Sequence, residues 1–175
     1  MGPLSIPEPS LVVLVGPAGS GKSHFARRHF RPTEVLSSDV FRGWVCDDEN
    51  DQSASAQAFE VLHFVASRRL ARARLTVIDA TNVQFDARAP LLALARQYRL
   101  PAVAIVLNVS ERVCRERCAA RAERPIAAHV IRSQLLQLSG SIDNLLQEGF
   151  QEVHLLDEGT VGQVEIARRP QSGVG

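Results

Sequence analysis

Lysine is almost absent from this 175-residue chain: 19 of its 20 basic residues are arginine, and Lys22 is the one lysine. A genome rich in G and C favours arginine codons over lysine codons, so codon drift accounts for most of this bias. Drift should still leave lysine where chemistry needs a compact ammonium group. The surroundings of Lys22 are therefore the first place to search for a functional site.

Cysteine is scarce too, with only Cys46, Cys114 and Cys118. Three cysteines are too few for a disulfide framework, and their odd number indicates reduced thiols in a cytoplasmic protein. No His or Cys pair lies beside them at the spacing of zinc ligands. The N-terminus has no basic stretch typical of a secretory signal, and no apolar run approaches the ~18 residues that cross a bilayer. We therefore expect a cytoplasmic protein with no membrane contact.

Net charge is nearly zero, because 20 basic residues face 19 acidic ones. The charges are unevenly distributed: residues 1–60 carry −3, residues 61–135 carry +8 and residues 136–175 carry −4. A basic middle third can bind phosphates or nucleic acid, or it can be the solvated face of arginine-rich helices. The charge distribution alone leaves both interpretations open.

The hydrophobic pattern predicts alternating strands and helices within one domain. Buried strands are expected at residues 11–15, 34–37, 75–79, 102–107 and 152–156, with an edge strand at 163–167. Helices are expected at residues 22–30, 51–73, 86–97, 110–122 and 126–147. Such alternation is typical of right-handed βαβ units and a parallel sheet. Residues 1–168 are predicted to form the domain, and residues 169–175 a linker or disordered tail.

A phosphate-binding loop follows the first expected strand. Residues 16–23 match G-x-x-x-x-G-K-[ST] at every required position, and a helical pattern begins where the motif needs one. The loop's N–H groups and the helix dipole favour an anion, Lys22 reaches the β- and γ-phosphates, and the Ser23 hydroxyl is a Mg²⁺ ligand. The predicted ligand is therefore ATP or another NTP with Mg²⁺, held by Gly16, Gly19, Ser20, Gly21, Lys22 and Ser23.

Two further strands end in carboxylates. In a parallel sheet, ligands gather at the carboxyl ends of strands. Asp39 follows the second expected strand, with Arg42 three residues later. Asp39 is a candidate general base toward an acceptor hydroxyl, and Arg42 is placed to orient it and to neutralise the transferred phosphoryl group. An ordinary surface ion pair or a helix cap is the alternative.

The third strand ends at Asp79. This carboxylate suits a role in which it holds a Mg²⁺-bound water or the loop residue Ser23. The alternative is that Asp79 and Asn82 only cap the next turn.

An arginine-rich helix is expected at residues 110–122. Arg117, Arg121 and Arg124 follow one another at spacings of four and three, which would place them along one helical face. Guanidinium groups match phosphate oxygens, so this helix is predicted to act as a lid over the nucleotide. A solvated basic face is the alternative.

Together with the loop, the pattern predicts an α/β fold: a P-loop kinase-like parallel sheet of about five strands flanked by helices, with an arginine-rich helical lid.

Five segments together resemble the N-terminal 5′-hydroxyl polynucleotide kinase module of bacterial Pnkp, an RNA end-healing and sealing kinase-phosphatase-ligase. They are Gly16–Ser23, Ser38–Arg42, Asp47–Gln52, Asp79–Asn82 and the pair Arg117/Arg124. The acidic segment Asp47–Gln52 is more specific than the loop. The resemblance extends from about Pro7 to Leu156.

The resemblance implies Mg²⁺-dependent transfer of the γ-phosphoryl group of an NTP to the 5′-OH end of RNA or DNA. It implies that Asp39 is the general base, that Arg42 contacts Asp39 and the reacting phosphate, and that Gln52 lies near the acceptor strand. Arg117 and Arg124 would be lid contacts to the nucleotide. Phosphatase and ligase modules would follow in a longer protein. This chain lacks the second lysine that lysyl-nucleotidyl ligase chemistry needs, so we expect the kinase module alone.

Two other functions fit the same motifs. A P-loop kinase of a small-molecule hydroxyl acceptor would share the loop and the strand-end aspartate, but would have a closed acceptor pocket. A nucleotide-binding regulatory module would need no acceptor chemistry at Asp39. Trp44 is a candidate for stacking on a base, although a lone aromatic side chain also serves packing.

Overall fold

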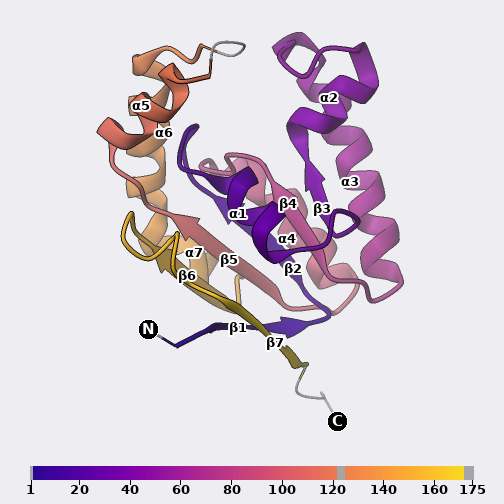
Figure 1. Ribbon diagram of the computed structural model, residues 1–175. Helices are drawn as coiled ribbons and strands as arrows, with labels where there is room; N and C mark the ends of the chain where they lie inside the picture. The colour runs from indigo at the N-terminus through magenta and orange to yellow at the C-terminus, as the bar shows by residue number, and fades with distance from the viewer. Residues whose placement is uncertain (1, 122–124, 172–175) are drawn as a thin grey trace.

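The computed structural model describes residues 2–121 and 125–171, and its centre is a five-stranded parallel sheet (Figure 1). The strands are β3 (Val35–Ser37), β4 (Thr76–Asp79), β2 (Leu11–Val15), β5 (Ala102–Leu107) and β6 (Glu152–Leu156), in that spatial order. All neighbouring pairs are parallel. The predicted α/β class and five-stranded parallel sheet are confirmed.

Both faces of the sheet are covered, because the central strands β2 and β5 are apolar at every position. Leu11, Val13 and Val15 of β2 pack into one hydrophobic cluster, whereas Val12 and Leu14 pack into another on the opposite face. Successive side chains of a strand point to opposite faces, so a continuous apolar run requires helices on both sides.

Helices form the two outer layers. Their bounds are α1 (Lys22–His29), α2 (Ser38–Cys46), α3 (Ser55–Ala71), α4 (Phe85–Gln97), α5 (Glu111–Ala119), α6 (Ala128–Ser141) and α7 (Leu145–Glu148). Apolar residues of α3, α4 and α7 join the first cluster, those of α1 and α5 join the second, and α6 contributes to both. Helices α2–α3 and α5–α6 stand on opposite sides of the sheet's upper end in Figure 1. No helix in the described residues is long and apolar enough to cross a membrane.

A small second sheet closes the lower end of the domain. Strand β1 (Leu4–Glu8), which no sequence pattern predicted, pairs in parallel with β7 (Ile166–Pro170). The apolar residues Leu4 and Ile6 are buried in the second cluster. Strand β7 begins later than the edge strand predicted at residues 163–167, and it includes Arg169 and Pro170, which were predicted to lie in the tail.

The long helix predicted at residues 126–147 is broken. Helix α6 ends at Ser141, a 3₁₀ turn covers Ile142–Asn144, and α7 follows. The Ser141 hydroxyl donates to the carbonyl of Gln137 (2.8 Å) and lies 3.2 Å from that of Val83. A serine that bonds back to the preceding turn bends a helix. Apolar residues of the whole segment, such as Ile131, Leu138 and Leu145, are buried, but the prediction of one continuous helix was wrong.

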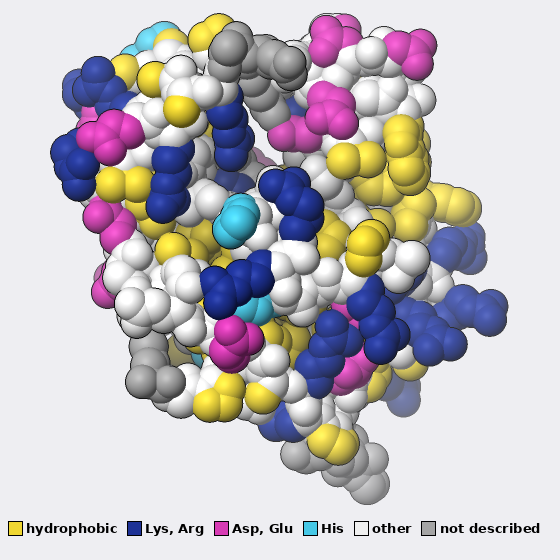
Figure 2. Space-filling model, viewed as in Figure 1, with side chains coloured by type: hydrophobic (Ala, Val, Ile, Leu, Met, Phe, Trp, Pro, Cys, Tyr) yellow, Lys and Arg dark blue, Asp and Glu magenta, His cyan; other side chains and the backbone are white. Residues whose placement is uncertain are grey.

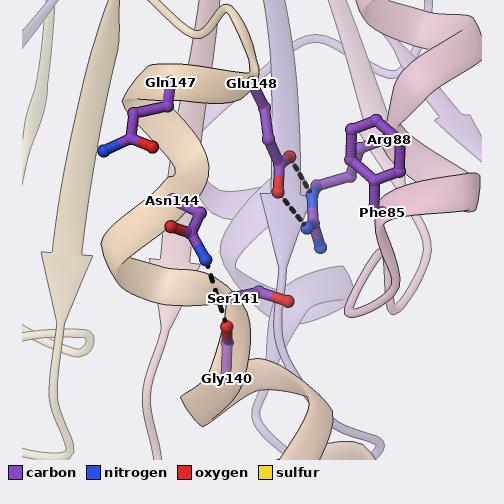
Figure 3. Close-up of a pocket in the computed structure, with 7 residues that line it drawn as sticks. All are labelled: Phe85, Arg88, Gly140, Ser141, Asn144, Gln147 and Glu148. Atoms are coloured by element: carbon purple, nitrogen blue, oxygen red, sulfur yellow. Dashed lines mark hydrogen bonds and ion pairs between the residues drawn. The ribbon is translucent and has the colours of Figure 1, made fainter.

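A buried ion pair joins α4 to α7 (Figure 3). The Arg88 side chain is fully buried, and its Nε and Nη2 donate to the two carboxylate oxygens of Glu148 at 2.8 and 2.6 Å. Its Nη1 donates to the carbonyl of Asn82 at 2.9 Å. These bonds satisfy the guanidinium on three sides and tie both helices to the turn after β4.

We expect Glu148→Ala to lower the free energy of unfolding by about 3–5 kcal/mol, because it leaves a buried guanidinium without its counter-charge. The double variant Arg88→Met/Glu148→Leu should recover most of this loss, since it removes both charges. Urea unfolding followed by circular dichroism measures both effects.

The matched control is Glu116→Ala, which breaks the exposed Arg112–Glu116 pair and should change stability little. Equal losses for Glu148→Ala and Glu116→Ala would contradict a structural role for the buried pair.

Candidate nucleotide-binding and phosphoryl-transfer site

The loop between β2 and α1 has the backbone shape of an anion site. Gly19 and Gly21 have φ angles of +80° and +99°, which glycine adopts without strain. Gly21 is the N-cap residue of α1, and no described side chain caps this helix end. The first N–H groups of α1 are therefore available to a phosphate, and the helix dipole favours one.

The loop rests directly on α5. A Cβ atom built on Gly19 would lie 2.3 Å from the carbonyl oxygen of Cys114 and 2.9 Å from Cys118 Sγ. Arg117 Nη1, also on α5, donates to the carbonyls of Gly19 and Ser20 at 3.4 and 3.2 Å. Close packing and these two bonds fix the outer side of the loop.

Lys22 lies inside the loop. Its ammonium donates to the carbonyls of Gly16 (2.8 Å) and Pro17 (2.7 Å), with Ser20 Oγ at 3.4 Å. Burial lowers the pKa of Lys22 from 10.5 to about 8, and the nearby negative charge of Asp79 offsets part of this effect. A phosphate brought to this ammonium would supply a counter-charge and so compensate for the hydration that burial removes.

Ser23 and Asp79 meet at the start of α1. The Ser23 hydroxyl hydrogen-bonds the Asp79 carboxylate, and burial is the main cause that raises the pKa of Asp79. A hydroxyl and a carboxylate are hard oxygen donors of the kind that Mg²⁺ prefers, and this ion is usually held by one or two protein groups plus phosphates. The described residues contain no cluster of three or more His, Cys, Asp or Glu side chains fit for a metal. Ser23 and Asp79 therefore fit a nucleotide-linked Mg²⁺.

The turn after Asp79 holds the loop from the other side. The Gly16 N–H donates to the carbonyl of Thr81 at 2.9 Å, and Asn82 Nδ2 donates to the carbonyl of Leu14 at 2.8 Å. Asn82 thus acts on the end of β2, rather than only capping its own turn.

Asp39 and Arg42 form an ion pair on α2, which begins where β3 ends. The Arg42 side chain is 4% exposed, and its Nε donates to the carbonyl of Glu49 at 2.8 Å. Asp39 is more accessible, with 34% of its side chain exposed. A buried guanidinium anchored at both ends thus fixes the orientation of a carboxylate that faces the cavity.

The loop and the strand-end carboxylates line one cavity of about 520 Å³. Its walls come from the loop, the turn after β4, α2–α3 and the start of α6. The lining includes Gly19, Gly21, Lys22, Ser23, Asp39, Arg42, Gln52, Asp79 and Arg121. The structure therefore brings together most of the residues singled out in the sequence.

Two of the three lid arginines are described. Arg117 lies on α5, but α5 ends at Ala119, earlier than predicted. Arg121 follows the helix and lines the cavity, so Arg117 and Arg121 do not share a helical face as their spacing suggested. Arg124 lies outside the described residues.

Gln134 is a contact that the sequence did not indicate. Its side-chain oxygen accepts a 2.8 Å hydrogen bond from the N–H of Ala18 in the loop. Gln134 lies on α6, 116 residues after Ala18 in the sequence, and the fold brings the two residues into contact. No local motif marks this glutamine.

Comparison with known proteins places the chain in a family. The family model described as an AAA domain matches residues 11–145. The chain belongs to this AAA domain family. No curated protein matches its sequence.

Solved structures show the fold of this family member. A candidate kinase from Chloroflexus aurantiacus j-10-fl has a TM-score of 0.67 at 18% identity, with 91% of each chain covered. A chain of the Pnkp1/Rnl/Hen1 RNA repair complex has a TM-score of 0.68 at 23% identity, covering 80% of this chain and 47% of that one. Shikimate kinase from Acinetobacter baumannii has a TM-score of 0.54 at 18% identity, with 87% of each chain covered. The fold is P-loop kinase-like, and it is shared by a shikimate kinase and by a chain of an RNA repair complex.

We expect nucleotide binding to take up a proton above about pH 8, because free Lys22 loses its proton near that pH and bound phosphate restores it. The affinity for a non-hydrolysable NTP analogue should fall by up to about tenfold per pH unit above that point. Calorimetry in two buffers of different ionisation enthalpy measures the uptake, which should approach one proton at pH 9.

The variant Lys22→Met is the control, and it should lose both the proton uptake and most of the affinity. Undiminished uptake in this variant would assign the proton to another group.

Proposed function

We propose that this chain is an NTP-dependent kinase that phosphorylates the 5′-hydroxyl end of RNA or DNA. The observation that carries the proposal is the ion pair of Asp39 with Arg42 in the cavity that Lys22 and Ser23 also line. A carboxylate oriented by a buried guanidinium, beside a phosphate-binding loop, is the arrangement that phosphoryl transfer to a hydroxyl needs. Its resemblance in sequence to bacterial polynucleotide kinase modules and its structural similarity to a chain of an RNA repair complex support a polynucleotide acceptor.

The proposed step is an in-line displacement. Asp39 accepts the proton of the acceptor hydroxyl. At the same time the hydroxyl oxygen forms a bond to the γ-phosphorus, and the bond from that phosphorus to the β–γ bridging oxygen breaks. The products are the phosphorylated end and a nucleoside diphosphate. Lys22 and the N–H groups of the loop stabilise negative charge on the phosphates, and Arg42 holds Asp39 in place.

Other residues have supporting roles in this proposal. Ser23 would ligate Mg²⁺ and Asp79 would hold it through water, and the ion would neutralise phosphate charge when bound. Arg117 and Arg121 would contact the nucleotide phosphates. Gln52, which lines the same cavity, would lie beside the acceptor. A longer protein with phosphatase and ligase modules belongs to the same proposal, and the coding sequence beyond Gly175 tests it.

The decisive experiment measures transfer of labelled γ-phosphate from ATP to a 5′-OH oligonucleotide, by wild type and by Asp39→Asn. We expect the variant to lose about 10²- to 10⁴-fold in kcat, because general-base catalysis contributes that much. The near-isosteric asparagine keeps the size of the side chain, so nucleotide affinity should change little.

The matched control is Asp86→Asn, which changes an exposed carboxylate in the first turn of α4. Asp86 does not line the cavity. It should transfer phosphate as the wild type does. Transfer to sugars or other small hydroxyl compounds, with none to oligonucleotides of any length, would favour the small-molecule kinase. Full activity of Asp39→Asn would overturn the assignment of the base.

A further inference from the structure

A second and larger cavity opens from the same reaction centre. Its volume is about 1,230 Å³, against about 520 Å³ for the nucleotide cavity. Ser23, Asp39 and Asp79 line both cavities. The second one continues along the edge strand β3, between α1 and helices α2 and α3, and we call it the edge groove. It exceeds the ~300–1,000 Å³ of ordinary small-molecule pockets, so an extended ligand suits it better.

The edge groove has an aromatic platform on α2. Trp44, the only tryptophan in the chain, lines it and is 73% exposed. The indole ring packs edge-on against Phe41, with centroids 5.0 Å apart and planes at 65°. Phe41 is itself buried in the core, so Trp44 is anchored on one side and open to solvent on the other. An anchored, exposed ring is a surface on which a base can stack.

The rest of the groove combines apolar walls with three arginines. Phe30, Pro32, Val35 and Val40 line it together with Arg27, Arg69 and Arg121, the last of which also lines the nucleotide cavity. Figure 2 shows hydrophobic side chains gathered over α2 and α3, with Lys or Arg side chains next to them near the right edge of the view. Apolar surface interleaved with guanidinium groups is typical of grooves that follow a single nucleic-acid strand.

Arg69 lines this groove and is held in place by the backbone before β4. Its Nη2 donates to the carbonyl of Leu75 at 2.8 Å, whereas its buried Nε has no hydrogen-bond partner in the described part of the chain. Burial is also the main cause that lowers the pKa of Arg69, and the nearby charge of Glu34 offsets part of this effect. Glu34 is itself paired with Arg168, so a phosphate in the groove would add a counter-charge for Arg69.

Charge changes along the edge groove. Its acidic side chains are Asp39 and Asp79 at the reaction centre and Glu49 beside α2. Arg69 is anchored to Leu75, just before β4, whereas Asp79 ends that strand. Leu75 and Asp79 are four positions apart along the extended chain, which corresponds to about 13 Å. A ligand that presents a hydroxyl at Asp39 and a phosphate farther along therefore matches the groove.

We propose that the edge groove binds the single-stranded segment of the acceptor that follows its 5′ end, with a base on Trp44 and backbone phosphates at Arg27 and Arg69. This inference rests on the proposed function, because it assigns the path of the acceptor at the same reaction centre.

The lone tryptophan provides a direct test in the 175-residue chain without NTP. Titration with a 5′-OH hexanucleotide should quench the fluorescence of Trp44 in a saturable manner, and ATP alone should not. Anisotropy of a labelled hexanucleotide should show about 5- to 100-fold weaker binding by Trp44→Ala, because stacking one base contributes about that much. Trp44→Phe should recover part of the affinity.

Charge variants give a second, independent measurement. Arg69→Gln and Arg27→Gln should each weaken binding and reduce the slope of log K against log salt by about 0.7, the value for one phosphate contact on a single strand. The matched control is Phe64→Ala, which removes an exposed aromatic side chain of α3 outside the groove and should bind as wild type does.

Kinase assays separate this inference from the proposed function. Trp44→Ala should raise KM for a hexanucleotide acceptor, whereas Phe64→Ala should keep the wild-type kcat and KM. Normal transfer to oligonucleotides by the wild type, with no quenching and unchanged KM in Trp44→Ala, would overturn the edge groove as the acceptor path. Quenching by oligonucleotide without any transfer would support polynucleotide binding in the groove and overturn the proposed kinase.

Discussion

The position of β4 between β3 and β2 is the constraint on which the rest of the site depends. Asp79 at the end of β4 is paired with Leu14 of β2 on one side and with Ser37 of β3 on the other. In a parallel sheet these three strand ends lie at one edge, so the loop after β2 and the helix after β3 begin on either side of the same carboxylate. One register therefore brings the phosphate-binding loop and the Asp39 carboxylate together.

The sequence predicted the parts of the structure that follow from local patterns. The apolar run before Gly16 could only be a strand with two covered faces, and the motif after it requires a phosphate-binding turn. Asp39 and Arg42 were recognisable because three-residue spacing on a helix makes such a pair adjacent. The pairing of β1 with β7 was not recognisable, because it joins segments from opposite ends of the chain, and three prolines near the N-terminus disguised the first strand. The break at Ser141 depended on a hydrogen bond back to the preceding turn, which an apolar stripe does not reveal.

The candidate site shows the same division. Residues inside the loop motif were predictable one by one, since each has a chemical task fixed by its place in the motif. Gln134 and Arg69 were not, because their relevance comes from the backbone groups and cavities to which the fold brings them. Arg121 falls between these cases: its presence near phosphate was predicted, but the helix that was expected to carry it ends two residues earlier.

The near absence of lysine has a consequence for the covalent chemistry of this chain. Its only ε-amino group lies within the phosphate-binding loop, and a pKa of about 8 gives that amine far more of its nucleophilic neutral form at neutral pH than an ordinary lysine has. Any acylation of a side-chain amine, whether by an acetyl donor or by a labelling reagent, must therefore modify the nucleotide site itself. A phosphate held against that amine would favour its protonated form, so a bound nucleotide should slow the modification of Lys22.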